Sequence, residues 1–124
     1  MTREDVEVHI LKAYGCEPEY PWFKFPGYAV YRHRENRKWF AVVMNLSKRK
    51  IGIDEEGIVD VMNLKCDPIL IGSLLLKKGI FPAYHMNKGN WISVILDGSV
   101  PDQEIKWLVD MSFDLTVKKL KSQS

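Results

Sequence analysis

The chain has 124 residues, of which 46% are hydrophobic and 27% are charged, with 8 Gly and 6 Pro. This length suits one domain over residues 1–124 with a single core, and the composition excludes low-complexity disorder as the main state. The net charge of +2 is too small to indicate nucleic-acid binding by itself, so the distribution of charge matters more than its sum.

The N-terminal half of the chain predicts one helix followed by strands. Thr2 precedes Asp5 by three residues, which is close to a capping box, and apolar residues recur at helical spacing up to Gly15. Aromatic and β-branched side chains then dominate two runs on either side of a polar turn, which indicates a hairpin formed by residues 28–34 and 38–46. Further turns separate two more expected strands, at residues 51–53 and 58–64.

The C-terminal half predicts two helices around one strand. Asp67 can cap a helix with Pro68 in its first turn, running over residues 69–76, and a strand follows at 91–96. Ser99 and Asp102 have the spacing of a second capping box. The buried face of the final helix is expected to carry Ile105, Leu108, Val109, Ser112 and Leu115.

The order of these elements is α-β-β-β(-β)-α-β-α, without regular alternation of strand and crossover helix. That order favours an α+β domain of two layers, in which an antiparallel sheet packs against helices, over a doubly wound α/β fold. The chain shows no internal repeat, and its end at residues 118–124 is expected to fray.

Basic residues gather around the predicted hairpin, and acids follow them in sequence. Seven cations lie between residues 32 and 50, against the single acid Glu35: Arg32, Arg34, Arg37, Lys38, Lys48, Arg49 and Lys50. They can neutralise DNA phosphates or simply protect exposed turns and strand edges. The expected strand over residues 38–47 lies between the cations of residues 32–38 and those of residues 48–50. At about 3.3 Å per residue it separates these two clusters by roughly 30 Å, so they need not form one patch.

The segment before the last strand is the best candidate site in the sequence. It combines aromatic rings for stacking on a base with polar groups for phosphate, namely Tyr84, His85, Asn87, Lys88, Asn90 and Trp91. The alternative is turn chemistry, with the two large rings closing the core. The two interpretations differ in whether His85, Asn87 and Lys88 point outward together.

Other chemistry finds little support in the residues. Cys16 and Cys66 are far apart, and the histidines share no metal-ligand spacing, with His9 and His33 expected at the surface. A nucleophilic Cys66 would need an adjacent base, and none can be identified. We therefore expect no metal, no cofactor and no enzymatic activity. The chain has no long apolar run and no signal-like start, which predicts a cytoplasmic protein that does not enter the membrane.

Several blocks of sequence resemble the MmcQ/YjbR family. They are Lys65-Cys66-Asp67-Pro68, Pro82-Ala83-Tyr84-His85-Met86-Asn87-Lys88, Trp91-Ile92-Ser93-Val94 and Leu96-Asp97-Gly98-Ser99. The resemblance implies a small bacterial two-layer α+β domain, similar in shape to CyaY and to secretion chaperones, with a double-wing mode of DNA binding. It supplies no catalytic residue.

Two hypotheses about function follow. The first is a small DNA-binding or regulatory domain that contacts phosphate through Lys48, Arg49, Lys50 and Lys88, with Arg32, Arg34 and Arg37 secondary. The second is a protein-interaction module that holds a partner segment on an exposed sheet face or edge. An enzyme acting through His85 ranks third. The DNA hypothesis requires the cations to share one surface with the loop before the last strand.

Overall fold

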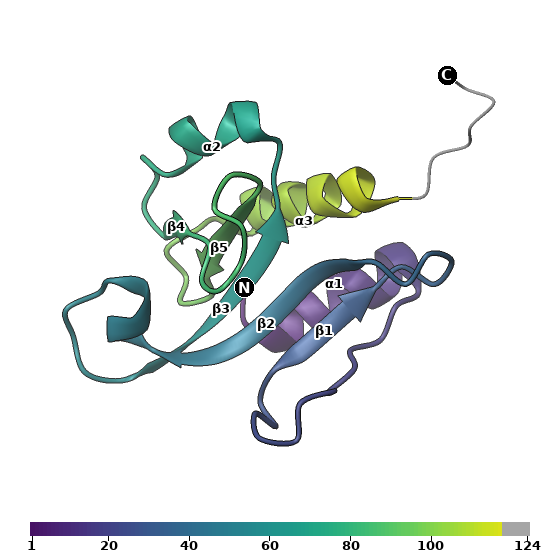
Figure 1. The fold of residues 1–124 in the computed structure, drawn as a ribbon, viewed down its shortest axis with the longest axis horizontal. Helices are drawn as coiled ribbons and strands as arrows, with labels where there is room; N and C mark the ends of the chain where they lie inside the picture. The colour runs from purple at the N-terminus through teal and green to yellow at the C-terminus, as the bar shows by residue number, and fades with distance from the viewer. Residues whose placement is uncertain (118–124) are drawn as a thin grey trace.

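The computed structural model describes residues 1–117, which form one sheet and three α-helices (Figure 1). The elements, in chain order, are α1 (Arg3–Tyr14), β1 (Ala29–Arg32), β2 (Trp39–Ser47), the 3-10 helix η1 (Lys48–Ile51), β3 (Ile58–Lys65), α2 (Pro68–Leu74), β4 (Ile80–Pro82), β5 (Trp91–Ile95) and α3 (Asp102–Thr116). The strands lie in the order β1-β2-β3-β5-β4, and every neighbouring pair is antiparallel. The predicted α+β class and the predicted antiparallel pairing are confirmed.

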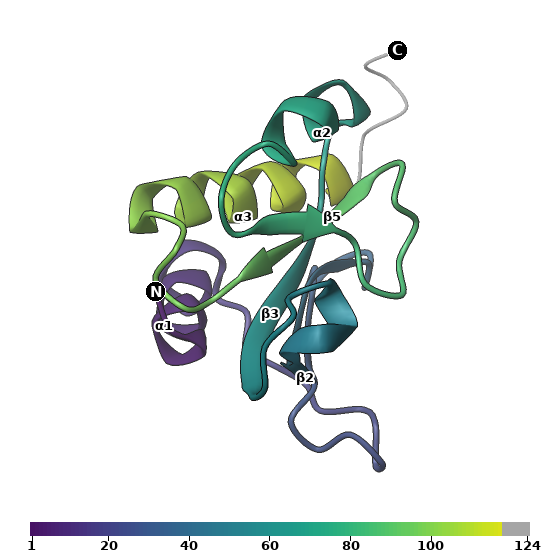
Figure 2. The same cartoon turned by 90° about the vertical axis from the view of Figure 1, so that its left-hand side faces the viewer.

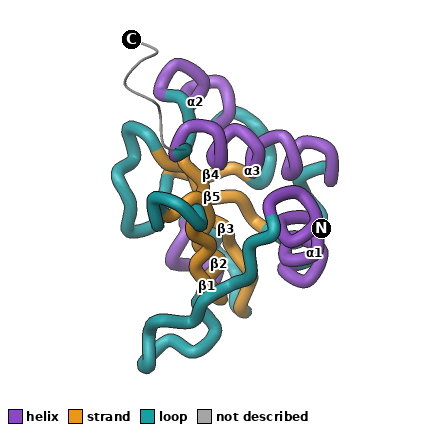
Figure 3. The backbone as a smooth tube through the Cα atoms, turned by 90° about the vertical axis from the view of Figure 1, so that its right-hand side faces the viewer, coloured by secondary structure: helices purple, strands orange, loops and turns teal. Residues whose placement is uncertain are grey.

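The helices cover one face of the sheet. Figure 2 and Figure 3 show α1 and α3 together on one side of the strands, with η1 on the other side. The capping box of α1 forms as predicted, because Thr2 and Asp5 each accept the other's backbone N–H, and Gly15 ends the helix in the left-handed region at φ 67°. Apolar side chains of all three α-helices join one core with the inward residues of the strands.

The buried face of α3 differs from the expected one at a single position. Ile105, Leu108, Val109 and Ser112 are buried, but Leu115 is 40% exposed and Thr116 takes the inward position. Steps of three or four residues along a helix reach 105, 108, 112 and 116, and position 115 is rotated about 100° away from 116.

Two local predictions are wrong, and one short strand was missed. Residues 51–53 form no strand: the Ile53 N–H bonds the Lys48 carbonyl, which closes the turn around η1. The predicted cap from Ser99 is absent, since α3 has no side-chain cap and Asp102 instead pairs with the N-terminal amine. The short strand β4 was not predicted, because three residues ending in a proline give too weak a pattern.

His33 is buried rather than exposed, with 5% of its surface accessible. Its Nε2 lies 2.7 Å from the Thr116 hydroxyl at the end of α3, and its ring packs on Phe113. Burial lowers the pKa of His33, which favours the neutral imidazole.

The predicted α2 begins at Asp67 and Pro68 as expected but ends at Leu74. The segment expected to fray lies outside the described residues.

Ser112 joins α3 to the sheet where two strands separate. The β2–β3 ladder ends at the pair Ala41 and Leu64, and the next residues outward are Phe40 and Lys65. The buried Ser112 hydroxyl donates to the Phe40 carbonyl and accepts the Lys65 N–H at 2.8 Å. One side chain thus satisfies two buried backbone groups that the ladder leaves open.

We expect Ser112→Ala to lower the free energy of unfolding by about 1–3 kcal/mol, because it leaves a buried donor and a buried acceptor without partners. Urea denaturation followed by circular dichroism measures this loss. The matched control is Ser73→Ala, which removes an exposed hydroxyl that bonds only the carbonyl three residues earlier. Equal losses in the two variants would show that the Ser112 bridge does not stabilise the fold.

Candidate functional site

The second face of the sheet is apolar and is covered by loops and the short 3-10 helix η1 instead of α-helices. We call it the open face; its buried residues are Val30, Val42, Met44, Leu46, Val59, Val61 and Ile95. Partly buried side chains from three connections pack against them, and these connections are residues 15–28, residues 48–57 and residues 83–90. Loops cover a sheet less completely than a helix does, and a hollow remains between them.

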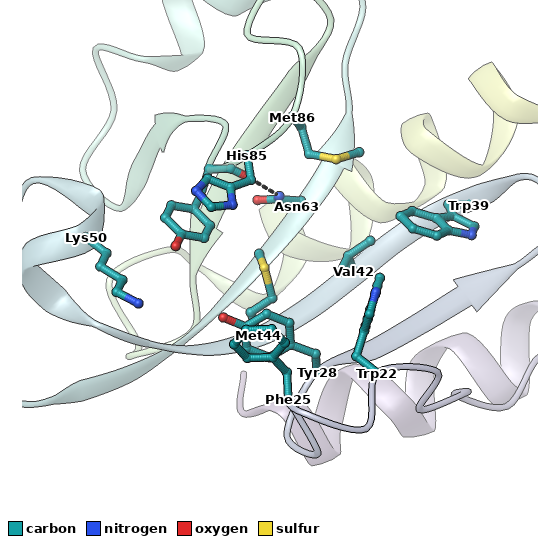
Figure 4. A pocket seen from close by; sticks show the side chains of 11 residues that line it. Trp22, Phe25, Tyr28, Trp39, Val42, Met44, Lys50, Asn63, His85 and Met86 are labelled. Atoms are coloured by element: carbon teal, nitrogen blue, oxygen red, sulfur yellow. Dashed lines mark hydrogen bonds between the residues drawn. The ribbon is translucent and has the colours of Figure 1, made fainter.

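This hollow, the aromatic pocket, has a volume of about 390 Å³ and opens to solvent (Figure 4). Strands β2 and β3 supply its floor through Val42, Met44 and Asn63. The surrounding residues come from the three connections and from the start of β2; they are Trp22, Phe25, Tyr28, Trp39, Lys50, Tyr84, His85 and Met86. The volume falls within the lower part of the range of ligand pockets in proteins, which is about 300–1,000 Å³.

The rings around the pocket pack in pairs. Trp22 meets Trp39 edge to face, with ring centroids 5.5 Å apart, and Phe25 stacks on Tyr28 at 4.8 Å. The Arg32 guanidinium lies 5.5 Å from the centre of the Trp39 ring, which is cation–π distance. Burial raises the pKa of the Tyr28 hydroxyl, which therefore stays protonated at neutral pH. The walls are largely flat and aromatic.

Two buried polar side chains hold Tyr84 in the wall. Asn63 Nδ2 donates to the Tyr84 carbonyl at 2.8 Å, and Ser93 Oγ accepts the Tyr84 N–H at 2.9 Å. The Ser93 hydroxyl in turn donates to Asn63 Oδ1, so each member of the group satisfies another. Both side chains are buried, at 1% and 0% exposure. This network fixes both backbone groups of Tyr84.

His85 adopts an unusual backbone conformation beside Tyr84. Its φ of 55° lies in the left-handed region, which non-glycine residues seldom occupy and which costs about 1–3 kcal/mol. The turn stacks the imidazole on the Tyr84 ring, with centroids 4.0 Å apart and planes 9° apart. Figure 4 shows His85 at one side of the pocket, across from Phe25 and Tyr28.

The predicted cations are not gathered on one surface. Arg32 and Arg37 pair with Glu19 at one end of β2, at 3.5 Å and 3.1 Å. At the other end, Lys48 pairs with Glu55, and Arg49 pairs with Asp54 and Glu56. Arg34 is exposed near Gly15, away from the residues that line the aromatic pocket.

Lys50 behaves differently from its neighbours. It lines the aromatic pocket, and within residues 1–117 no carboxylate lies within 4 Å of its amine. The basic cluster of η1 is therefore divided: two cations face the acids of their own connection, and the third faces the hollow.

The predicted polar loop is divided as well. Tyr84 and His85 line the pocket, whereas Asn87 and Lys88 are exposed farther along the loop, and the Asn87 side chain accepts the Gly89 N–H in the manner of a turn. The Asn90 carbonyl accepts the Cys66 N–H. Trp91 begins β5, is half-buried and does not line the pocket.

Sequence reasoning missed the segment that supplies most of the aromatic wall. Trp22 and Phe25 lie in a stretch to which no element or role was assigned, and Tyr28 was expected only as the first residue of a strand. Its aromatic residues, bracketed by Pro21 and Pro26, were the available signal. The isolated strand bridge between Glu19 and Val30 anchors this segment along β1.

Three remaining possibilities for chemistry can be addressed directly. Within residues 1–117 there is no cluster of three metal-ligating side chains, and no helix there has the length and apolar character needed to cross a bilayer. Burial raises the pKa of the Cys66 thiol, and the adjacent Asp67 raises it further, which disfavours a thiolate nucleophile.

We expect Ser93→Ala to loosen the wall of the pocket. The substitution leaves the Tyr84 N–H without its acceptor, so amide hydrogen exchange at Tyr84 should accelerate more than exchange at the core residue Val43. Exchange measured by NMR separates this local opening from global unfolding. Ser73→Ala is again the control, and an equal change at both amides in Ser93→Ala would contradict a local role.

Comparison with known proteins agrees with this architecture. A crystal structure of a Pseudomonas syringae protein superposes with a TM-score of 0.92 at 48% identity, over 94% of this chain and all of that one. A Deinococcus radiodurans structure, at 24% identity and a TM-score of 0.74, shows the same fold.

Sequence relatives give the family. YyaQ of Bacillus subtilis, described as uncharacterised, is 44% identical over 94% of this chain and 98% of its own length. YjbR of Escherichia coli is 38% identical over half of this chain and 53% of its own length. The YjbR family model matches residues 11–115. Because that match spans most of the sequence, the chain belongs to the YjbR family.

Proposed function

We propose that this chain is a non-catalytic module that binds a segment of a partner protein on the open face of its sheet. The observation that carries the proposal is the aromatic pocket, a hollow of about 390 Å³ in the face that lacks helices. A large apolar side chain of the partner inserts there, and its neighbours lie along the loops around the pocket.

The edges of the sheet are poor alternatives to its face. At one edge, β1 already exchanges two backbone hydrogen bonds through Val30 with Glu19. At the other edge, β4 has three residues and includes Pro82, which has no N–H to donate. Addition of a partner strand needs a free row of backbone groups, so recognition by side-chain insertion fits the structure better.

Exposed aromatic residues beside the pocket support the same proposal. On the segment that forms one wall, Phe23 is 98% exposed, Tyr20 is 55% exposed and Phe25 is 48% exposed. Single exposed apolar residues are common, but three on one short segment next to an apolar hollow are typical of an interaction surface.

The charge distribution favours a protein partner over DNA. Four of the cations proposed to contact phosphate have carboxylates beside them: Arg32, Arg37, Lys48 and Arg49. Exposed pairs are weak and can be broken, but each neighbouring acid still repels a phosphate. Binding to a duplex by the two ends of β2 would bring these acids close to the backbone.

Single-stranded DNA is the second candidate, and one observation favours it. Lys50 and Lys88 have no carboxylate partner within residues 1–117, and Tyr84 and His85 lie stacked at the pocket. Flat rings with a nearby cation are the elements by which proteins bind single strands. The bases would stack at the pocket while the lysines contact phosphates.

The partner-protein proposal is tested with a phage library of random 12-residue peptides selected on the purified chain. Enriched peptides should contain large apolar side chains, and they should shift the NMR amide signals of Met44, Asn63 and Met86 while leaving α1 unchanged. The pocket variant Trp22→Ala should weaken them, and Leu11→Ala on α1 should not. Failure to enrich any peptide, or shifts confined to α1 and α3, would refute the proposal.

Oligonucleotide titrations test the second candidate. If the chain binds DNA at the pocket, a labelled 12-residue oligothymidine should bind more tightly than a duplex, and its affinity should fall as salt rises. Lys50→Ala should weaken binding more than Arg49→Ala, because Arg49 already has acid partners. Fluorescence anisotropy at several salt concentrations measures both effects. Salt-independent affinity, or equal effects of the two substitutions, would count against DNA.

A further inference from the structure

We propose that the aromatic pocket recognises an aromatic side chain with carboxylates beside it in the partner's sequence. This inference rests on the proposed function and adds the chemistry of the ligand. Three features carry it: the scarcity of free polar groups on the floor of the pocket, the flat aromatic walls, and the sign of the charge at its rim.

The floor of the pocket, made by Val42, Met44 and Asn63, offers few hydrogen bonds to a ligand. Asn63 is the one amide side chain among the lining residues, and both its ends are occupied, by the Tyr84 carbonyl and the Ser93 hydroxyl. A polar side chain inserted there would lose its water and regain little, which costs free energy. An apolar ligand avoids that loss.

The shape of the walls favours a ring over an aliphatic chain. Trp22, Trp39, Phe25 and Tyr28 present ring faces and edges, and Tyr84 with His85 adds a stacked pair on the other side. Aromatic rings prefer edge-to-face and offset contacts with one another, so an inserted ring gains from these walls beyond the burial of its area.

The charge at the rim is positive. Lys50 is the only lysine or arginine among the 11 lining residues, and none of the 11 is acidic. The nearest acids in sequence, residues 54–56, face Lys48 and Arg49. A carboxylate next to the inserted ring therefore meets the amine of Lys50, which has no carboxylate within 4 Å in residues 1–117.

The same reasoning disfavours a cationic ligand. Boxes of aromatic rings often bind methylated lysine or other ammonium groups through cation–π contacts. Here the amine of Lys50 repels a second cation, and the Arg32 guanidinium already lies near the Trp39 ring. Positive charge in the ligand is opposed at the rim.

The test uses fluorescein-labelled 11-residue Gly/Ser peptides with a central Trp, flanked on each side by two Glu, two Lys or two further Ser residues. Anisotropy titrations of the full chain should rank them Glu, Ser, Lys, with about fivefold between successive members, the size expected for one exposed ion pair made or replaced by repulsion. Replacing the central Trp by Ala in the Glu peptide should abolish binding.

Variants of the chain separate the charge inference from the proposed function. Lys50→Glu should reverse the order of the Glu and Lys peptides. Lys12→Glu makes the same change in net charge at an exposed position of α1, and it should leave the order of the peptides unchanged. Circular dichroism verifies that both variants are folded. If Lys50→Glu does not fold, Lys50→Ala replaces it, and this variant should reduce the preference for the Glu peptide without reversing it.

Four results would overturn the inference. If all three peptides bind equally and the central Trp is still required, the partner proposal stands and the charge inference fails. If loss of the Trp changes nothing, or if Lys12→Glu acts like Lys50→Glu, neither the pocket nor its cation recognises the peptide. If no peptide binds the chain but oligothymidine does, the nucleic-acid candidate replaces both the partner proposal and the charge inference.

Discussion

Strand β2 lies between β1 and β3 and is apolar on both faces, and both layers around the sheet are arranged to cover it. Residues 40–44 form an unbroken buried run, as in strands that have cover on each side. Helices α1 and α3 provide that cover on one side only. On the other side three connections cover the strand, and they leave a hollow between them. The pocket is thus a product of how the second face is shielded.

Buried hydroxyl and amide side chains form hydrogen bonds with backbone groups at two places in this structure. On the helix side, Ser112 closes the end of the β2–β3 ladder. On the loop side, Asn63 and Ser93 bind the backbone of Tyr84 from the neighbouring strands β3 and β5. In each case a small buried polar group replaces a strand partner, so the fold and the wall of the pocket depend on the same kind of interaction.

The sequence predicted what depends on local signals. Thr2, Gly15, Asp67 and Pro68 mark helix ends through bonds within a few residues, and the strand patterns gave the class of fold. The pocket could not be predicted, because its walls come from three connections that are separated along the chain by whole strands and whose packing follows no period. The ion pairs of Arg32 and Arg37 could not be predicted for a related reason: Glu19 meets them only after its segment pairs along β1.

The pocket has a floor made of strands and walls made mostly of loops, and this division separates two kinds of evolutionary change. Substitutions in β2 or β3 disturb the core and lower the free energy of unfolding. Substitutions between residues 20 and 28 touch few buried groups, so descendants of one ancestor can acquire new ligand preferences while the scaffold persists. Relatives that share this architecture are therefore free to diverge in what they recognise, and likeness of fold alone does not transfer a ligand from one to another.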